Sequence, residues 1–247
     1  MLYKQENITL VDEVRKTGRG NRVWIEILKF LAVLTPINLI MVFAGEAIKA
    51  ALFQKSVINE EISMIIQLYE CALGIGLVVL YCCCIEKRTF MSMGFMKRHV
   101  CKQYIKGACV GAMLISALVW MGVLFNTFIF NGFNVNLDKK SIFLFLGGFL
   151  LQGFYEELVF RGFFMISIIR KNTIFVAVMV NSILFGLTHG FNNGFQVLAL
   201  LNLILFGIFE SIYLLKTGNI WGISAIHSMW NFIQGNIYGF NVSGMAQ

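Results

Sequence analysis

The chain has 247 residues, of which 58% are hydrophobic, and its formal net charge at pH 7 is +7. A soluble fold could not bury this much apolar surface, and several apolar runs approach the roughly 20 residues that a membrane-spanning helix needs, so the composition predicts a polytopic helical membrane protein. Nucleic-acid binding is not favoured, because the basic residues lie at the ends of the apolar runs, where they set membrane topology.

Hydropathy predicts an all-α transmembrane bundle of about seven spans, with six to eight as the range. We expect a cytoplasmic amino-terminal tail (1–22) without the apolar core of a cleavable signal peptide, followed by a single transmembrane domain (23–247). The predicted helices cover about 23–43, 62–85, 104–130, 141–169, 173–191, 195–215 and 220–238. The first of them contains Pro36, which neighbouring helices can accommodate.

The fourth apolar run, 141–169, is too long for a simple span. At about 1.5 Å per residue it exceeds the roughly 30 Å hydrocarbon core of a bilayer. We therefore expect it to tilt, to extend into water, or to break near Gly147 and Gly148 or near Gly153.

The distribution of basic residues predicts the orientation. Lysines and arginines gather in the tail, in the loop after the second helix and beside the turns at 170–171 and 216, whereas the opposite side holds only Lys49, Lys55, Lys139 and Lys140. The positive-inside rule then places the amino terminus in the cytoplasm of a cell-membrane protein. The six cysteines form no CxxC pair, which argues against a zinc ribbon or a disulfide scaffold.

Two adjacent carboxylates and an arginine lie inside the fourth apolar run, where ionisable groups are costly and are rarely retained without a task. Successive residues of a helix point about 100° apart, so Glu156 and Glu157 cannot face the same partner, whereas Glu157 and Arg161 can. The spacing predicts a Glu157–Arg161 ion pair that leaves Glu156 free to act. A purely structural ion pair is the alternative interpretation.

Two further acidic residues, Glu70 and Glu210, fall within apolar runs and lack a basic partner on their own helices. We interpret them as protonated acids that form hydrogen bonds between helices.

Two histidines lie on apolar helices, whereas His99 lies in a basic loop and is interpreted as solvated. Glu156 precedes the turn at 171–172 by about 15 residues and His189 follows it by about 17, so the two reach similar depths on antiparallel neighbours. His227 and Asn231 are four residues apart and share a helical face, where they could act as paired hydrogen-bond donors. Each histidine taken alone also fits a packing or helix-joining role.

Three motifs in this order resemble those of the CPBP family, the CAAX protease and bacteriocin-processing (Abi) intramembrane proteases. Glu156-Glu157 with Arg161 resembles its EExxxR motif, Phe185 to His189 its FxxxH motif, and His227 to Asn231 its HxxxN motif. The likeness covers a catalytic core of about 141–238, and the first three helices carry no motif.

The resemblance implies peptide-bond hydrolysis within the membrane. By this analogy Glu156 and His189 hold and deprotonate a water, His227 and Asn231 stabilise the oxyanion, and Glu157 and Arg161 provide structural support. The implied substrate is a membrane-associated peptide or small membrane protein, with a bacterial role in maturing a peptide signal or bacteriocin or in self-immunity. The partners expected are this substrate and the lipid bilayer, and not nucleic acid.

Family members are often described as metalloproteases, so Glu156, His189 and His227 are also a candidate zinc site. No helix carries HExxH, and a metal that took Glu156 would leave the reaction without an evident general base, so we favour a metal-free arrangement. Two other classes stay open: a proton-coupled transporter, which would usually show paired repeats, and a non-catalytic binding or immunity protein.

Overall fold

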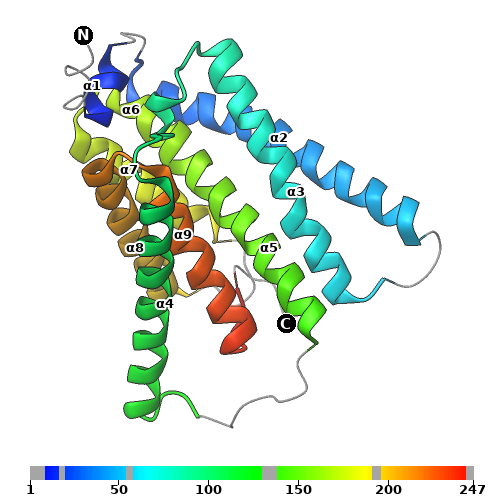
Figure 1. Cartoon of the computed structure of the whole chain (residues 1–247). Coiled ribbons are helices and arrows are strands. Elements are labelled where there is room, and N and C mark those ends of the chain that lie inside the picture. The colour runs from blue at the N-terminus through cyan, green and yellow to red at the C-terminus, as the bar shows by residue number, and fades with distance from the viewer. Residues whose placement is uncertain (1–8, 17–19, 54–57, 130–137, 191–195, 243–247) are drawn as a thin grey trace.

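The structure is a computed structural model that describes residues 9–16, 20–53, 58–129, 138–190 and 196–242. These residues form helices and no β-strand, which confirms the predicted all-α fold (Figure 1). Within the same ranges, 5 helices are long and apolar enough to cross a membrane, and α7 is a shorter apolar helix. The prediction of about seven spans is therefore met only approximately.

The helices are listed here in chain order. They are α1 (Leu10–Arg15), α2 (Val23–Phe53), α3 (Glu60–Leu80), η1 (Tyr81–Ile85), η2 (Met91–Met93), α4 (Val100–Leu124), α5 (Lys139–Glu157), η3 (Leu158–Met165), α6 (Ile166–Ile169), α7 (Ile174–Thr188), α8 (Val197–Thr217), α9 (Ile220–Phe232) and η4 (Ile233–Ile237). Of the short elements, η1, η3 and η4 are π-helical and η2 is a 3-10 turn.

Several predicted helix ends were wrong. Helix α2 continues to Phe53 instead of ending at 43, and α4 covers Val100–Leu124 instead of 104–130. The last helix changes from α to π geometry after Phe232. Hydropathy reports which residues suit hydrocarbon, not where backbone hydrogen bonding stops, so such errors are expected. The predicted boundaries at 191 and 195 lie outside the described residues.

The fourth apolar run is one continuous helix from α5 through η3 to α6, so of the three alternatives expected for it the break at a glycine does not occur. A Cβ added to Gly148 would lie 2.8 Å from Cβ of Leu68 on α3, so this glycine permits close helix packing and not a break. The irregularity lies further on, in the π-helix η3 that follows Glu157 directly.

Side-chain caps fix where several of the helices begin. The Asn59 side chain accepts a hydrogen bond from the backbone N–H of Ile62 at 2.8 Å, and the Thr173 hydroxyl accepts one from Val176 at 3.3 Å. Gly218 ends α8 with a φ of 64°, a left-handed conformation that glycine adopts without strain.

Helix α9 lies at the centre of the bundle and packs against both α4 and α5 (Figure 1). Gly107 and Gly111 of α4 form a GxxxG pair, and a Cβ on either would overlap backbone atoms of α9. A Cβ on Gly153 of α5 would lie 2.7 Å from the backbone nitrogen of Ser228. These contacts bring α9 close to the segment that carries the carboxylates.

The core is centred on η3. All eight of its residues are buried, including the charged Arg161. Helix α3 packs on the other side of α5, and α7 pairs with α8. The acidic motif thus lies in the middle of the molecule and is reached by side chains from several helices.

Candidate active site

Glu157 and Arg161 form the predicted ion pair. The Nη1 atom of Arg161 lies 2.8 Å from Oε1 of Glu157, and both side chains are fully buried. The Nη2 atom of Arg161 also lies 3.1 Å from Oε2 of Glu210 on α8. The guanidinium therefore bridges two carboxylates, and Glu210, which has no basic partner on its own helix, finds one on the helix that carries Arg161.

His227 completes this buried group. Its Nδ1 atom lies 2.8 Å from Oε1 of Glu157 and 3.9 Å from Oε2 of Glu210. The predicted Glu157–Arg161 ion pair is therefore part of a larger buried group. Two ionised carboxylates and one guanidinium would leave a net charge of −1, so the group is neutral only when one further proton is bound, either by His227 or by Glu210.

The second carboxylate, Glu156, faces the two histidines. Its Oε2 atom lies 3.6 Å from Nε2 of His227 and 4.0 Å from Nε2 of His189. The three residues come from α5, α9 and the end of α7, so the structure brings together the residues that the motifs predicted. Glu156 Oε2 is buried and has no hydrogen-bond partner among the described residues.

The hydrogen bond at His189 indicates which ring nitrogen carries the proton. Its Nδ1 atom lies 2.8 Å from the backbone carbonyl oxygen of Phe185. A carbonyl oxygen only accepts, so Nδ1 donates and the Nε2 lone pair faces Glu156. The Nδ1 atom of His227 faces a carboxylate in the same way. With neutral imidazoles, three acceptor atoms face one another, an arrangement that suits a hydrogen-bond donor such as water.

Gln152 is a site residue that was not identified from the sequence. Its side-chain amide donates a short hydrogen bond to Oε1 of Glu156, and its carbonyl oxygen accepts one from Nδ2 of Asn231 at 3.0 Å. Gln152 therefore links Asn231 to Glu156 and leaves Oε2 of Glu156 free. The four-residue spacing between Gln152 and Glu156 was a signal that could have revealed this contact.

Two cavities lie at the candidate site, and Glu156 lines the second of them. The first, of about 540 Å³, lies among α4, α7, α8 and α9 and is lined by His189, His227 and Asn231 together with apolar side chains such as Phe206 and Trp230. The second, of about 250 Å³, is lined by Glu156 itself and by several polar groups. The polar residues of this second cavity are Asn38, Gln67, Glu70, Gln152, Tyr155 and Glu156.

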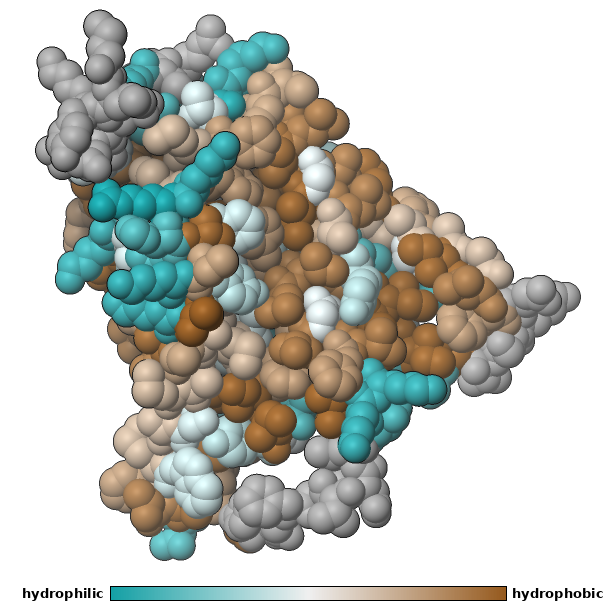
Figure 2. Space-filling model, in the orientation of Figure 1, coloured by the Kyte–Doolittle hydropathy of each residue, from teal (hydrophilic) through white to brown (hydrophobic). Residues whose placement is uncertain are grey.

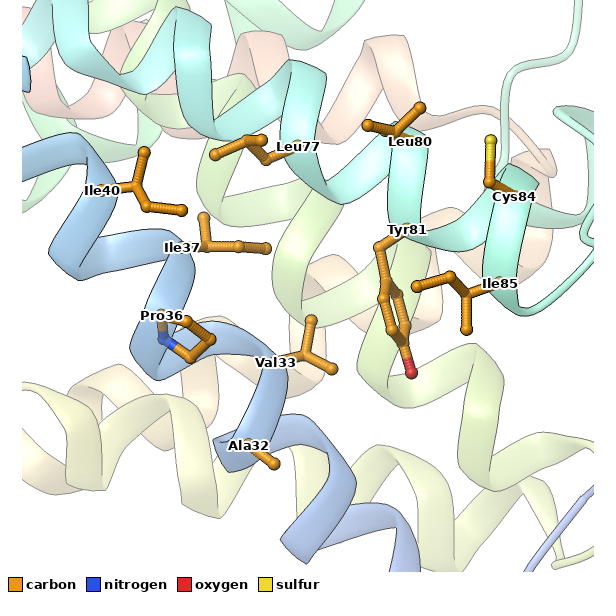
Figure 3. Close-up of a pocket in the computed structure, with 10 residues that line it drawn as sticks. All are labelled: Ala32, Val33, Pro36, Ile37, Ile40, Leu77, Leu80, Tyr81, Cys84 and Ile85. Atoms are coloured by element: carbon orange, nitrogen blue, oxygen red, sulfur yellow. The ribbon is translucent and has the colours of Figure 1, made fainter.

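A third cavity, of about 500 Å³, lies between α2 and α3 (Figure 3). Val33, Ile37 and Leu77 point into it, and the other labelled side chains are also apolar except for the Tyr81 hydroxyl and the Cys84 thiol. None of the motif residues lines it, so it is not part of the site.

Two of the three separations among the predicted zinc ligands, 3.6 and 4.0 Å from Oε2 of Glu156, are close to those of a tetrahedral zinc site, but the set as a whole is wider. Zinc ligands at about 2.0 to 2.1 Å lie about 3.4 Å from one another, whereas Glu156, His189 and His227 do not all lie within 4.8 Å. The group of described residues that meets this spacing is Glu157, Glu210 and His227. In that group the guanidinium of Arg161 already lies against both carboxylates and supplies the positive charge that a metal ion would otherwise provide.

A second buried charge cluster holds η3 from the other side. Nη1 of Arg88 donates hydrogen bonds to the carbonyl oxygens of Gly162 and Phe163 at 3.2 and 3.1 Å. A π-helix shifts the backbone pairing by one residue and exposes such carbonyls. Arg88 belongs to the basic loop after the second predicted helix, where a solvated side chain was expected, but its side chain is fully buried.

Glu86 anchors Arg88 in this cluster. Its carboxylate lies 2.6 Å from Lys29, 2.5 Å from Arg88 and 3.2 Å from Arg170. Burial raises the pKa of Glu86, but the attraction of Arg88, Lys29 and Arg170 outweighs it, so the pKa lies below the usual value.

Comparison with known proteins gives one family match. The family model described as "Type II CAAX prenyl endopeptidase Rce1-like" matches residues 138–233. No curated protein and no solved structure matches the chain. The matched segment begins at the residue that caps α5 and ends at the start of η4. It contains every motif residue, as well as Gln152 and Glu210.

Proposed function

We propose, from the premise that residues 138–233 are a domain of the Rce1-like family of CAAX-type intramembrane endopeptidases, that Glu156 activates the water that hydrolyses the peptide bond. The observation that carries this assignment is the buried, unpartnered Oε2 atom of Glu156, 3.6 and 4.0 Å from two imidazole nitrogens. A water at this point would donate one hydrogen to Glu156 and the other to Nε2 of His189. A glutamate withdrawn from bulk water suits a general base that later protonates the leaving amine.

The oxyanion is assigned to His227 and Asn231. His227 can serve as an oxyanion donor when it carries the proton that neutralises its group with Glu157, Arg161 and Glu210, because Nε2 then bears a hydrogen that points toward the cavity. One amide hydrogen of Asn231 is used by Gln152, so the second is free for the oxyanion. Arg161 and Glu157 hold His227 in place and do not touch substrate.

The two cavities suggest separate routes for peptide and water. The cavity of about 540 Å³ is lined mainly by apolar and aromatic groups and suits an apolar peptide segment in extended form. The smaller cavity, between α2, α3 and α5, is lined by Glu156 and other polar side chains as well as by apolar ones, and it suits a few water molecules beside the carboxylate. Hydrolysis within a membrane requires both, because the hydrocarbon core contains almost no water.

The substrate we propose is a membrane-associated peptide or small membrane protein, matured as a peptide signal or bacteriocin or cleaved in self-immunity. The matching family is named for prenyl endopeptidases, so a peptide with a prenylated cysteine near its carboxyl terminus is the natural comparison substrate. The basic residues gathered at one end of the bundle support a cytoplasmic amino terminus.

Cleavage of defined peptides tests the proposal. Purified protein in detergent is incubated with internally quenched apolar peptides, with and without a prenylated cysteine, and products are identified by mass spectrometry. We expect cleavage by the wild type and by Glu46→Gln, whose exposed carboxylate pairs with Lys49 outside the site. Glu156→Gln should give no product, and cleavage at the wild-type rate by that variant would refute the assignment.

A further inference from the structure

A large cavity lies at the end of the bundle where α4 begins, away from the candidate active site. Its volume is about 940 Å³, and it is formed by the loop before α4, the start of α4 and the turn between α8 and α9. Figure 2 shows hydrophilic side chains gathered over the beginning of α4, beside apolar surface. By the proposed topology this end faces the cytoplasm.

The charges that line this cavity are all positive. Lys97, Arg98 and Lys216 contribute to its wall, and no carboxylate does. In the described part of the chain, none of the three lies within ion-pair distance of an acidic side chain, although Nε of Arg98 donates to the His99 ring at 3.2 Å. Like charges held together without a counter-ion favour an anionic ligand.

The wall is held in place by buried contacts across the two loops. Asn219 is 2% exposed, and its side-chain amide donates to the carbonyl oxygen of Arg98 at 3.2 Å. The backbone N–H of Ile220 donates to the carbonyl oxygen of Gly94 at 2.9 Å. The Phe95 ring packs against Trp221 with a centroid separation of 5.8 Å. Arg98 and Lys216 are therefore presented from a fixed frame and not from two independent loops.

Exposed apolar side chains adjoin the cations. Phe90 and Met91 line the same cavity and are 55% and 37% exposed, and Ile105 on the next turn of α4 is 65% exposed. A free phosphate would use only the cations. A phospholipid would use both features, because its headgroup is charged and its acyl chains run along apolar surface.

We propose that this cavity binds the headgroup of an anionic phospholipid, with its phosphate at Arg98 and Lys216 and its acyl chains beside Phe90 and Met91. The guanidinium of Arg98 offers paired donors for phosphate oxygens, and Lys216 adds a point charge. Basic pockets between helices on the cytoplasmic side are suited to such headgroups. The proposal does not depend on the proteolytic function.

Native mass spectrometry in a neutral detergent measures the affinity directly. The probes are phosphatidylglycerol as anionic lipid, phosphatidylcholine as neutral lipid with the same chains, and inorganic phosphate as competitor. The test variant is Arg98→Gln with Lys216→Gln. The control is Lys106→Gln with Lys171→Gln, which removes the same charge from exposed residues that do not line the cavity.

We expect phosphatidylglycerol to bind the wild type more tightly than phosphatidylcholine does. Each cation near the headgroup raises the affinity for an anionic lipid about fivefold, so the test variant should bind phosphatidylglycerol about 25-fold more weakly than the wild type. The control variant should lose less than about threefold in affinity. An equal loss in both variants, or equal affinity of the wild type for the two lipids, would overturn the proposal. Displacement of phosphatidylglycerol by millimolar inorganic phosphate would overturn the assignment of a lipid ligand and would identify the cavity as a site for free phosphate.

Discussion

Glu157 and His227 are joined by a 2.8 Å hydrogen bond between Oε1 and Nδ1, deep in the bundle and 70 residues apart in the chain. The same Glu157 oxygen accepts from Arg161 at 2.8 Å. This carboxylate therefore couples the buried ion pair to the imidazole that faces Glu156. In the proposed mechanism Glu157 thereby fixes the ring orientation of His227 without contacting the substrate itself.

Removing Arg161 should damage folding before it damages chemistry. Arg161→Ala leaves the carboxylates of Glu157 and Glu210 buried without their shared cation, which costs about 3 to 5 kcal/mol. We expect a low yield of folded protein and a lowered thermal unfolding midpoint in detergent. Lys102→Ala, which removes an exposed cation, serves as the control. A wild-type midpoint for Arg161→Ala would contradict the bridging role.

Asn231→Ala should remain folded but lose most of its activity. Loss of one oxyanion donor costs about 10² to 10³ in rate, so residual cleavage should be measurable at high enzyme concentration. His227→Ala should be at least as damaging, and His189→Ala should abolish cleavage without loss of membrane insertion. An Asn231→Ala enzyme with the wild-type kcat would remove Asn231 from the mechanism.

Gln152 should act by orienting Glu156. Gln152→Leu removes the amide that holds Oε1 of Glu156 and the acceptor of Asn231, while keeping a similar volume. We expect kcat to fall about tenfold or more with little change in KM, because the groups lost position the reaction and do not bind the peptide. A rise in KM at constant kcat would show instead that Gln152 belongs to the peptide-binding surface.

How far the sequence predicts this site depends on whether an interaction is local. Helical spacing was sufficient to predict the Glu157–Arg161 pair. The number of residues on each side of the turn was sufficient to predict that His189 approaches Glu156. Glu210 could not be assigned to Arg161, because the rotation of α8 about its axis depends on packing with other helices. The burial of Arg88 was missed for a related reason. Hydropathy marks 86–103 as a loop, but the π-helix η3 offers carbonyl oxygens that accept hydrogen bonds from the Arg88 guanidinium.

The pairing of α4 with α9 should tolerate no added methyl group. Gly107→Ala places a Cβ against the backbone carbonyl of Gly222, which a rotamer change cannot relieve, and overpacking of this kind costs about 1 to 3 kcal/mol. Gly76→Ala is the matched control, because a Cβ there meets nothing within 4 Å. We expect a lowered thermal midpoint for Gly107→Ala alone. Equal midpoints for the two variants would contradict the close approach of α4 and α9.

Acid should weaken the cluster around Glu86. Since the pKa of Glu86 is lowered in the folded protein, its stabilising contribution is complete above the unfolded value of about 4.3 and is lost as the pH falls through the lower folded value. The difference in unfolding midpoint between wild type and Glu86→Gln should therefore be constant near neutrality and shrink below about pH 4. A difference that stays constant down to pH 3 would show that Glu86 does not titrate in this way.

Chelation should leave the enzyme active. Because the spacing of Glu156, His189 and His227 does not suit a tetrahedral ion, we expect the cleavage rate to survive treatment with a zinc chelator. Metal analysis of the purified, active protein completes this test. Near-stoichiometric zinc that is lost together with activity, and restored with it, would make these three residues ligands and leave the endopeptidase assignment intact.

Isotope incorporation tests the central claim, that Glu156 activates water for attack on a peptide bond, most directly. Cleavage in water enriched in oxygen-18 should place one heavy oxygen in the new carboxyl terminus of the product. We predict this label with the wild type and with Glu46→Gln, and no product above the uncatalysed background with Glu156→Gln, although that variant is folded. Labelled product formed by Glu156→Gln at the wild-type rate would contradict the account.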